Sequence, residues 1–207
     1  WAWVCDEATG ADVAASVART PNFWFAGTFS GIRYSEDGCQ WGDIPALRGR
    51  YLFHIQADEM VHDLLWAATA EGLWGVREGH EAHLDLPSPF SLRHFGQQKD
   101  GSFLLLGFDG AQPIADLDGQ RMPLPTKAGR MAVLSRDDND RFYVRFARGL
   151  QDQLMRLSVD GVEILRDRTE PVYGVESLDG HIYLLQRKGI AWSSDDGATW
   201  SAPRGRP

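Results

Sequence analysis

The sequence PVYGVESLDGHIYLLQRKGIAWSSDDGATWSA, residues 171–202, contains the clearest indication of the fold. Short apolar runs alternate in it with turn residues, which is typical of strands joined by tight turns. We expect four strands, over residues 171–178, 181–186, 190–193 and 199–202. The turns between them are predicted at Asp179-Gly180, at 187–189 and around Asp196-Gly197. Four strands in about 40 residues leave little room for helices.

The acidic-glycine turn of this stretch recurs along the chain. The glycines of five such pairs are 41, 40, 42 and 36 residues apart, the pairs being Asp37-Gly38, Glu78-Gly79, Asp118-Gly119, Asp160-Gly161 and Asp196-Gly197. A period of about 40 residues is the size of one four-stranded propeller blade. Other acidic-glycine pairs also occur, so the assignment needs a second marker.

Short apolar runs supply that second marker. Their starts are 41, 39, 39 and 40 residues apart, and the runs are 23–25, 64–66, 103–105, 142–144 and 182–184. Each follows residues that favour turns, namely Asn22, Asp63, Asp100-Gly101, Asn139-Asp140 and Asp179-Gly180. Each run therefore predicts a buried strand after a tight turn.

The two markers together predict an all-β chain. We expect a β-propeller of about five four-stranded blades that forms one domain over residues 1–207, or part of a larger ring if blades are missing from the chain. Residues 1–5 are left over and could pair with the last blade near 199–202, which would hide an open edge. A helix over residues 57–68 is the competing interpretation. It is disfavoured because the equivalent positions of other repeats hold turn residues and β-type runs.

The composition limits the partners. The 207 residues are 43% apolar and 24% charged, with a net charge of -8 and a pI near 5.2. Nucleic acid and anionic membranes are bound through clustered Lys and Arg, so neither is expected as a partner. The nearest cluster, 145–148 with Arg156, is interpreted as a solvated hairpin. No apolar stretch approaches the roughly 20 residues needed to cross a bilayer, so no membrane insertion is expected.

The two cysteines allow one disulfide, between Cys5 and Cys39. Such a bridge would stabilise the chain by roughly 3 to 4 kcal/mol if unstrained and would indicate an oxidising compartment. The alternative is two unrelated thiols, one of them buried. The bridge is favoured because Cys39 lies in a predicted surface turn, where a free thiol would be a liability. The chain starts at Trp1 without an export signal, which suggests a mature or trimmed product.

Residues 193–200, SSDDGATW, match the Asp-box or BNR pattern Ser-x-Asp-x-Gly-x-Thr-Trp at every defined position. Residues 34–41, YSEDGCQW, resemble a degenerate copy that keeps the Gly and the Trp. The resemblance implies that the box forms a hairpin between the third and fourth strands of a blade. It implies structural roles for Ser193, Asp195, Gly197, Thr199 and Trp200, and for Asp37, Gly38 and Trp41 in the first copy.

Proteins that resemble this family include sialidases, other glycan-cleaving enzymes, assembly factors and sorting receptors. The resemblance therefore selects no activity. Residues 3–8, WVCDEA, together with a Cys inside the first box, are similar to a pattern in exported bacterial Asp-box proteins of unassigned role. We accordingly expect a secreted, periplasmic or cell-surface protein.

A search for catalytic and metal motifs is negative. The string 31–34, GIRY, lacks the Pro of the sialidase Phe/Tyr-Arg-Ile-Pro motif. No Gly-x-Ser-x-Gly elbow or phosphate-binding Gly-rich loop occurs, so no nucleotide cofactor is expected. Residues 79–83, GHEAH, are not the zinc motif His-Glu-x-x-His, and 137–140, DDND, lack the Gly and distal Glu of an EF-hand. We expect neither metal nor cofactor, and a solvated turn at 137–140.

In a propeller, a ligand is expected at the channel mouth, near the innermost strand of each blade. Those strands are predicted over 13–19, 51–57, 91–97, 131–136 and 172–178. Their candidate ligand-binding residues are His54, Gln56, Arg93, His94 and Tyr173. We expect a non-catalytic binding or assembly module that recognises a protein or a glycan. The alternative is a glycoside hydrolase or lyase at the channel mouth. Asp58, Glu59 and Glu176 are among the carboxylates that we do not place in turns, and a solvated edge is expected for each.

Overall fold

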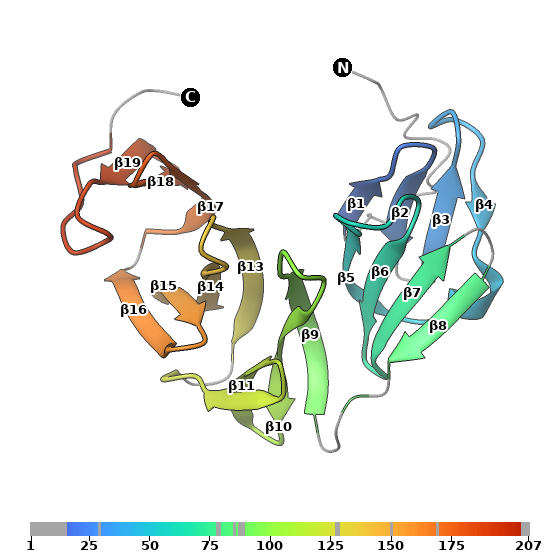
Figure 1. Ribbon diagram of the computed structural model, residues 1–207, viewed down its shortest axis with the longest axis horizontal. Coiled ribbons are helices and arrows are strands. Elements are labelled where there is room, and N and C mark those ends of the chain that lie inside the picture. Colours follow the sequence, from blue (N-terminus) through green and yellow to red (C-terminus); the bar gives the residue numbers. More distant parts are fainter. Residues whose placement is uncertain are drawn as a thin grey trace. The chain divides into compact units, whose positions relative to one another are not determined.

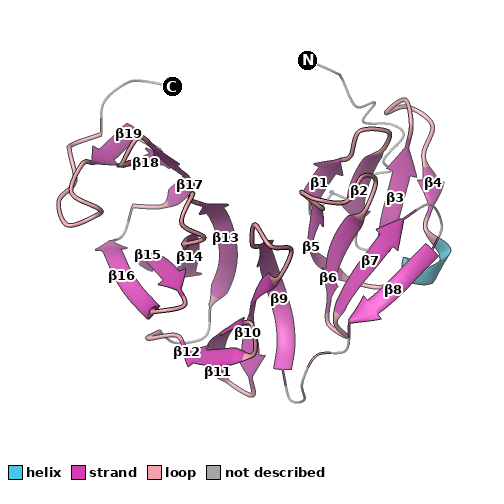
Figure 2. Cartoon of the chain, in the orientation of Figure 1, coloured by secondary structure: helices cyan, strands magenta, loops and turns pink. Residues whose placement is uncertain are grey.

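The computed structural model describes residues 16–28, 30–77, 80–84, 86, 90–126, 129–149, 151–168 and 170–203. The chain divides into two compact units, Trp1–Gln97 and Gln98–Pro207, and each is described by itself. The described residues form five antiparallel sheets, in which neighbouring strands follow one another in the chain (Figure 1). The one helical element among them is a 3-10 turn, Pro45–Leu47 (Figure 2).

The sheets repeat the same up-and-down order. The first contains β1 (Ser16–Arg19), β2 (Trp24–Thr28), β3 (Gly31–Ser35) and β4 (Gly42–Asp43), and the second contains β5 (Leu52–Ala57), β6 (Leu65–Thr69), β7 (Leu73–Arg77) and β8 (His80–Leu84). The third contains β9 (Phe90–Gln97), β10 (Phe103–Asp109), β11 (Gln112–Leu117) and β12 (Gln120–Pro123). The fourth contains β13 (Arg130–Arg136), β14 (Phe142–Arg148), β15 (Gln151–Ser158) and β16 (Gly161–Arg168), and the fifth β17 (Val172–Leu178), β18 (His181–Gln186) and β19 (Gly189–Ser193).

The repeat predicted from the sequence is confirmed. The expected innermost strands correspond to β1, β5, β9, β13 and β17, and the apolar runs lie in or lead into β2, β6, β10, β14 and β18. Residues 58–64 form bends and turns that lead into β6, so the competing helix over 57–68 is wrong. The predicted pairing of residues 1–5 lies outside the described residues.

Aspartates with positive φ occur in two kinds of turn. In the turn between the first and second strands of a sheet, the φ values are 60° at Asp63, 55° at Asp140 and 51° at Asp179. In the turn after the third strand, they are 52° at Asp118 and 57° at Asp196. Asp tolerates this left-handed backbone better than most residues because its short carboxylate can bond nearby backbone. These five aspartates, all identified as turn residues in the sequence, therefore have the conformation that their chemistry favours.

The fourth strand predicted at 199–202 is wrong, because the fifth sheet has three strands. Ser201 N donates a backbone hydrogen bond to Trp192 O at 2.9 Å. In the other direction Trp192 N donates to the hydroxyl of Ser201 at 2.9 Å instead of to a carbonyl. The backbone bond keeps residues 199–202 beside β19. Because the Ser201 hydroxyl takes the place of a backbone carbonyl, the regular backbone hydrogen bonding of a strand pair is interrupted.

Each unit has its own apolar core between sheets. In the first unit, Phe25, Ile32, Ile55, Leu65 and Val76 pack in one buried cluster drawn from the first two sheets. In the second unit, the third and fourth sheets share a cluster that includes Leu104, Leu117, Phe142 and Met155, and Tyr143, Leu154 and Leu184 belong to another cluster between the fourth and fifth sheets. Burying the faces of successive sheets in this way is how blade repeats gain stability.

Candidate functional site

Four of the five predicted ligand-binding residues lie on two neighbouring strands of the first unit. His54 and Gln56 lie on β5, and Arg93 and His94 lie on β9. The imidazole rings of His54 and His94 stack with their centroids 3.7 Å apart and their planes 20° apart. His94 Nδ1 donates to Phe95 O at 3.1 Å. The two histidines therefore contact each other between the second and third inner strands.

Both histidines are neutral at physiological pH. Burial, together with the nearby His94, lowers the pKa of His54 to about 2, although a hydrogen bond with the Gln56 side chain raises it. Burial likewise lowers the pKa of His94 to about 4. A general acid or base works best with a pKa near the operating pH. This pair is accordingly poorly suited to proton transfer at neutral pH.

Two aromatic residues that the sequence analysis did not select extend this cluster. The guanidinium carbon of Arg93 lies 4.4 Å from the centre of the Phe53 ring. Tyr51 packs edge-on against Phe53 at 5.0 Å and is 50% exposed. We call Tyr51, Phe53 and Arg93 the Tyr51–Arg93 face. The alternation of aromatic residues at 51 and 53 beside a buried Leu52 was a signal for an exposed aromatic pair on one side of the strand.

Tyr173, the fifth predicted residue, belongs to β17 in the second unit. Its side chain is 53% exposed, and the guanidinium carbon of Arg145 lies 5.9 Å from its ring centre. Arg145 Nε donates to Asp152 at 2.7 Å, and Asp152 is buried. The segment 145–148 ends β14 and pairs with β15 in a hairpin, as expected. Its Arg145 is only half-exposed, because the buried carboxylate of Asp152 holds it against the sheet.

The carboxylate of Asp195 organises the turn at residues 193–200. It accepts hydrogen bonds from Thr199 Oγ1 at 2.6 Å, Thr199 N at 2.9 Å and Ser193 Oγ at 2.7 Å. The bonds from the Thr199 side chain and backbone and from the Ser193 side chain lower the pKa of Asp195 to about 2. Gly197 N donates to Ser193 Oγ at 2.9 Å. These four hydrogen bonds all join residues of the turn itself.

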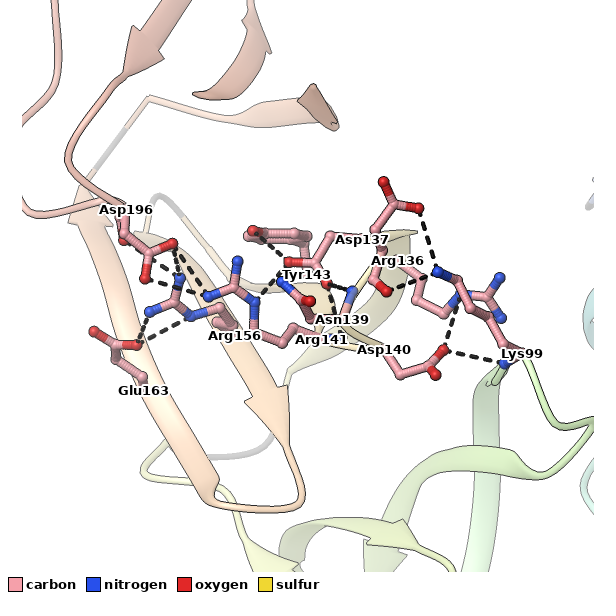
Figure 3. Close-up of polar contacts among 11 residues, drawn as sticks. Lys99, Arg136, Asp137, Asn139, Asp140, Arg141, Tyr143, Arg156, Glu163 and Asp196 are labelled. Atoms are coloured by element: carbon pink, nitrogen blue, oxygen red, sulfur yellow. Dashed lines mark hydrogen bonds and ion pairs between the residues drawn. The ribbon is translucent and has the colours of Figure 1, made fainter. Parts of the chain in front are cut away.

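Asp196 faces the neighbouring sheet instead of its own turn. Its carboxylate accepts from Arg156 Nη1 at 2.5 Å and from Arg141 Nη1 at 3.2 Å (Figure 3). Arg156 also donates to Glu163 at 2.5 Å. These contacts join the turn after β19 to β15 and to the loop before β14. The acidic-glycine pair of this turn therefore links the fourth and fifth sheets.

The turn at residues 34–41 uses the same chemistry one residue out of register. Ser35 Oγ donates to Asp37 Oδ1 at 3.0 Å, and Gly38 N donates to Ser35 Oγ at 2.8 Å. Asp37 also accepts from Cys39 N and Gln40 N, both at 2.8 Å. Trp41 Nε1 donates to Gly38 O at 3.1 Å. Both turns therefore share a serine hydroxyl that donates to the aspartate and accepts from the glycine amide.

Two acidic segments expected to be solvated are integrated into turns. Asp137 is buried, and its carboxylate accepts from Arg141 Nε at 2.7 Å and from Asn139 N at 2.9 Å (Figure 3). The solvated turn predicted at 137–140 is therefore wrong at Asp137. Asp58 accepts from Trp66 Nε1 at 2.7 Å and from Gln97 Nε2 at 2.8 Å. Burial alone would raise the pKa of Asp58, but these donors and two backbone amides lower it.

Other predicted features are only partly described. Among the described residues no cluster of three or more potential metal ligands is found. No free cysteine occurs in that part of the chain, but Cys5 lies outside it, so the Cys5–Cys39 disulfide stays a prediction. None of the described helical segments has the length and hydropathy of a membrane span.

No protein-family model matches the chain. No curated protein matches it either. Several solved structures do. YCF48 bound to a D1 peptide has 16% identity and a TM-score of 0.61, over 92% of this chain and 66% of that chain. Virginiamycin B lyase from Staphylococcus aureus has 11% identity and a TM-score of 0.65, over 89% of this chain and 67% of that chain.

A third neighbour is the extracellular domain of the two-component system BT3049 from B. thetaiotaomicron. It has 14% identity and a TM-score of 0.61, over 85% of this chain and 26% of that chain. This chain thus spans about two thirds of the length of the first two neighbours and about a quarter of the third. At such low identity the similarity concerns the fold alone. Together with the five antiparallel sheets, it shows that the chain has a β-propeller fold.

Proposed function

We propose that this chain is a non-catalytic binding module that recognises a protein segment through the Tyr51–Arg93 face. The observation that carries the proposal is the guanidinium of Arg93, which lies 4.4 Å from the Phe53 ring beside the half-exposed Tyr51. Tyr and Arg are enriched among the residues that dominate binding energy at protein interfaces. Arg93 lies on β9 and Tyr51 directly precedes β5, two of the strands expected to be innermost, where a propeller is expected to bind ligands.

The chemistry of the face favours a carboxylate on the partner. A guanidinium is planar and matches a carboxylate with two parallel hydrogen bonds. Stacking on Phe53 restricts Arg93 before a partner arrives, so less conformational entropy is lost on binding. Tyr51 adds a large amphipathic surface with few rotatable bonds. We therefore expect an acidic side chain or a C-terminal carboxylate next to an apolar residue in the recognised segment.

The histidines beside this face support binding over catalysis. With pKa values of about 2 and about 4, His54 and His94 are uncharged near neutral pH and weak as bases. YCF48, which has the same fold, is known with a bound D1 peptide. That complex is a precedent for peptide recognition by a propeller, and the identity of the partner here is part of the proposal.

We place the protein outside the cytoplasm as part of the same proposal. The predicted disulfide between Cys5 and Cys39 would be stable in an oxidising compartment. The neighbour BT3049 is an extracellular domain. Mass spectrometry of the natural protein under non-reducing conditions would test this location, because a reduced Cys5 and Cys39 in the isolated protein would contradict it.

Selection from a phage-displayed library of random 12-residue peptides tests the function. We expect the enriched peptides to contain an acidic residue or to bind through their C-terminus. Their affinity should fall at least about tenfold, the size of one lost charged hydrogen bond, in Arg93→Ala and in Tyr51→Ala. Trp192→Ala is the matched control, since Trp192 is an aromatic residue that is 40% exposed on β19. Its affinity should equal that of the wild type.

A glycan array and a panel of chromogenic glycosides test the competing functions. If a glycan binds saturably, if this binding requires Tyr51 and if no peptide is enriched, the partner is a glycan and not a protein. Turnover of a glycoside that one carboxylate substitution abolishes would make the chain an enzyme. Either result would contradict the proposal.

A further inference from the structure

A cleft of about 550 Å³ lies between the first and second sheets, both within the first unit. Its lining comes from the turns before β2 and before β6, from the segment that runs from β2 to the 3-10 turn, and from β7 and β8. A volume in this range is typical of sites that bury a small organic ligand. The cleft uses none of the residues of the Tyr51–Arg93 face, so its role does not depend on the proposed function.

The walls of the cleft are aromatic and apolar. Phe23 lies 6.2 Å from Tyr34 with the rings nearly perpendicular at 72°, and 6.1 Å from Phe25. Phe25, Ile44 and Val76 are buried, while Tyr34 is 39% exposed at the opening. The faces of such rings carry negative electrostatic potential, which attracts cations as well as apolar groups. The walls therefore suit a ligand with an apolar body.

Four carboxylates also line the cleft: Glu36, Asp43, Asp63 and Glu81. None of the described residues that line it is Lys, Arg or His. Asp43 is partly neutralised from outside the lining by Arg33 at 3.5 Å and Arg48 at 3.3 Å. Asp63 accepts hydrogen bonds from Asn22, which is uncharged. Glu36 and Glu81 are exposed and have no ion-pair partner within the described residues.

We propose that this cleft binds a small organic amine, with its ammonium between Glu36 and Glu81 and its apolar body against Phe23, Phe25 and Tyr34. The two glutamates are exposed lining residues and supply negative charge that no ion pair among the described residues neutralises. The rings supply cation–π attraction and an apolar surface. An anion would meet four carboxylates, and a neutral ligand of the same shape would gain only the apolar contact. Charge complementarity thus selects the amine.

Isothermal titration with 2-phenylethylamine tests the site. The neutral 2-phenylethanol and the anion 3-phenylpropionate serve as ligands of similar size. We expect saturable binding of the amine and an affinity at least about tenfold lower for the other two ligands. Two exposed carboxylate contacts and one cation–π contact together contribute a free energy of about that factor. Equal binding of amine and alcohol, or no saturable binding of the amine, would overturn the proposal.

The double variant Glu36→Gln, Glu81→Gln keeps the shape of the cleft and removes its free charge. It should bind the amine about fivefold to tenfold more weakly and bind 2-phenylethanol unchanged. Glu176→Gln on β17 is the matched control and should bind like the wild type. Unchanged amine binding in the double variant would refute the site. Because both glutamates are exposed, loss of folding is not expected, and the melting temperature of the variant checks this.

A tripeptide, acetyl-Gly-Arg-Gly-amide, tests whether the cation is instead a side chain of a macromolecular partner. Saturation by this peptide together with a failure of 2-phenylethylamine to bind would overturn the proposal of a small amine. The double variant should still bind the peptides selected on the Tyr51–Arg93 face with wild-type affinity. Failure of the cleft and failure of the proposed function can therefore be distinguished.

Discussion

Asn22 binds Asp63 through both its backbone and its side chain: Asn22 N donates to Asp63 Oδ1 at 3.2 Å, and Asn22 Nδ2 donates to Oδ2 at 2.6 Å. The two residues are 41 positions apart and lie in corresponding turns of the first and second sheets. The third and fourth sheets repeat the contact, because Lys99 N donates to Asp140 Oδ1 at 3.1 Å, also across 41 positions (Figure 3). The sequence period is thus expressed as a hydrogen bond between neighbouring sheets.

This contact predicts an effect of Asp63→Ala on stability. The substitution leaves two donors of Asn22 without their acceptor and places Ala at a φ of 60°. Asp179→Ala controls for the backbone strain, since Asp179 has a φ of 51° and an exposed side chain. In urea denaturation, Asp63→Ala should lower the unfolding midpoint clearly more than Asp179→Ala. Equal midpoints would mean that the contact between sheets contributes nothing.

The link between the fourth and fifth sheets predicts a salt-dependent effect of Asp196→Asn. Asn tolerates the φ of 57° but has no charge for Arg141 and Arg156, so the variant should lose about 1 kcal/mol at low salt. The loss should shrink at about 1 M NaCl, where the Debye length is about 3 Å. Asp160→Asn, an exposed aspartate in the corresponding turn of β15 and β16, should be neutral. A loss for Asp196→Asn that does not change with salt would exclude the electrostatic explanation.

The lowered pKa of Asp195 predicts the pH below which the last turn loses stability. Hydrogen bonds from Thr199 and Ser193 favour its charged form and lower its pKa to about 2, from an ordinary value of 3.8. Because the folded pKa is below the unfolded one, the stabilisation is complete above about pH 4 and is lost as the pH falls toward 2. NMR titration should give a carboxyl midpoint near pH 2. A midpoint close to 3.8 would show that these bonds do not form in solution.

A side chain at position 31 is expected to destabilise the fold strongly. It has a φ of 133°, and an added Cβ would lie 2.5 Å from the carbonyl oxygen of Leu47. Gly31→Ala should therefore cost about 3 kcal/mol or more. Gly110 has a φ of 59° with open space around it, so Gly110→Ala should cost only about 1 kcal/mol. Thermal denaturation of both variants measures the difference, and similar losses would contradict the close packing at Gly31.

The repeat could be predicted from sequence because it depends on local chemistry. Turn aspartates and glycines at a period of about 40 residues mark the ends of strands, and each apolar run between them fits one buried strand. The fourth strand at 199–202 failed because the Ser201 hydroxyl competes with a backbone carbonyl for Trp192 N, which the strand pattern does not reveal. In the turn at 34–41 the expected Asp37 does accept the turn hydrogen bonds. Its partner Ser35 was not selected, because it lies one position after the Ser of the aligned pattern.

The candidate site was less predictable because it depends on contacts between strands far apart in sequence. Polar residues on inner strands led to His54 and Arg93. They did not lead to the Phe53 ring, on which the guanidinium stacks, or to Tyr51, which packs against Phe53. The cleft between the first two sheets was missed because its lining residues are dispersed between positions 23 and 81 and share no sequence motif. The treatment of residues 1–207 as one propeller domain stays a proposal.

Mapping a selected peptide onto the protein by amide chemical shifts tests the central claim most directly. With the wild type, the shifts that change on titration should belong to Tyr51 and to residues of β5 and β9, including Phe53 and Arg93. These changes should vanish in Arg93→Ala. Changes confined to other strands, or retained in full in Arg93→Ala, would contradict recognition through the Tyr51–Arg93 face.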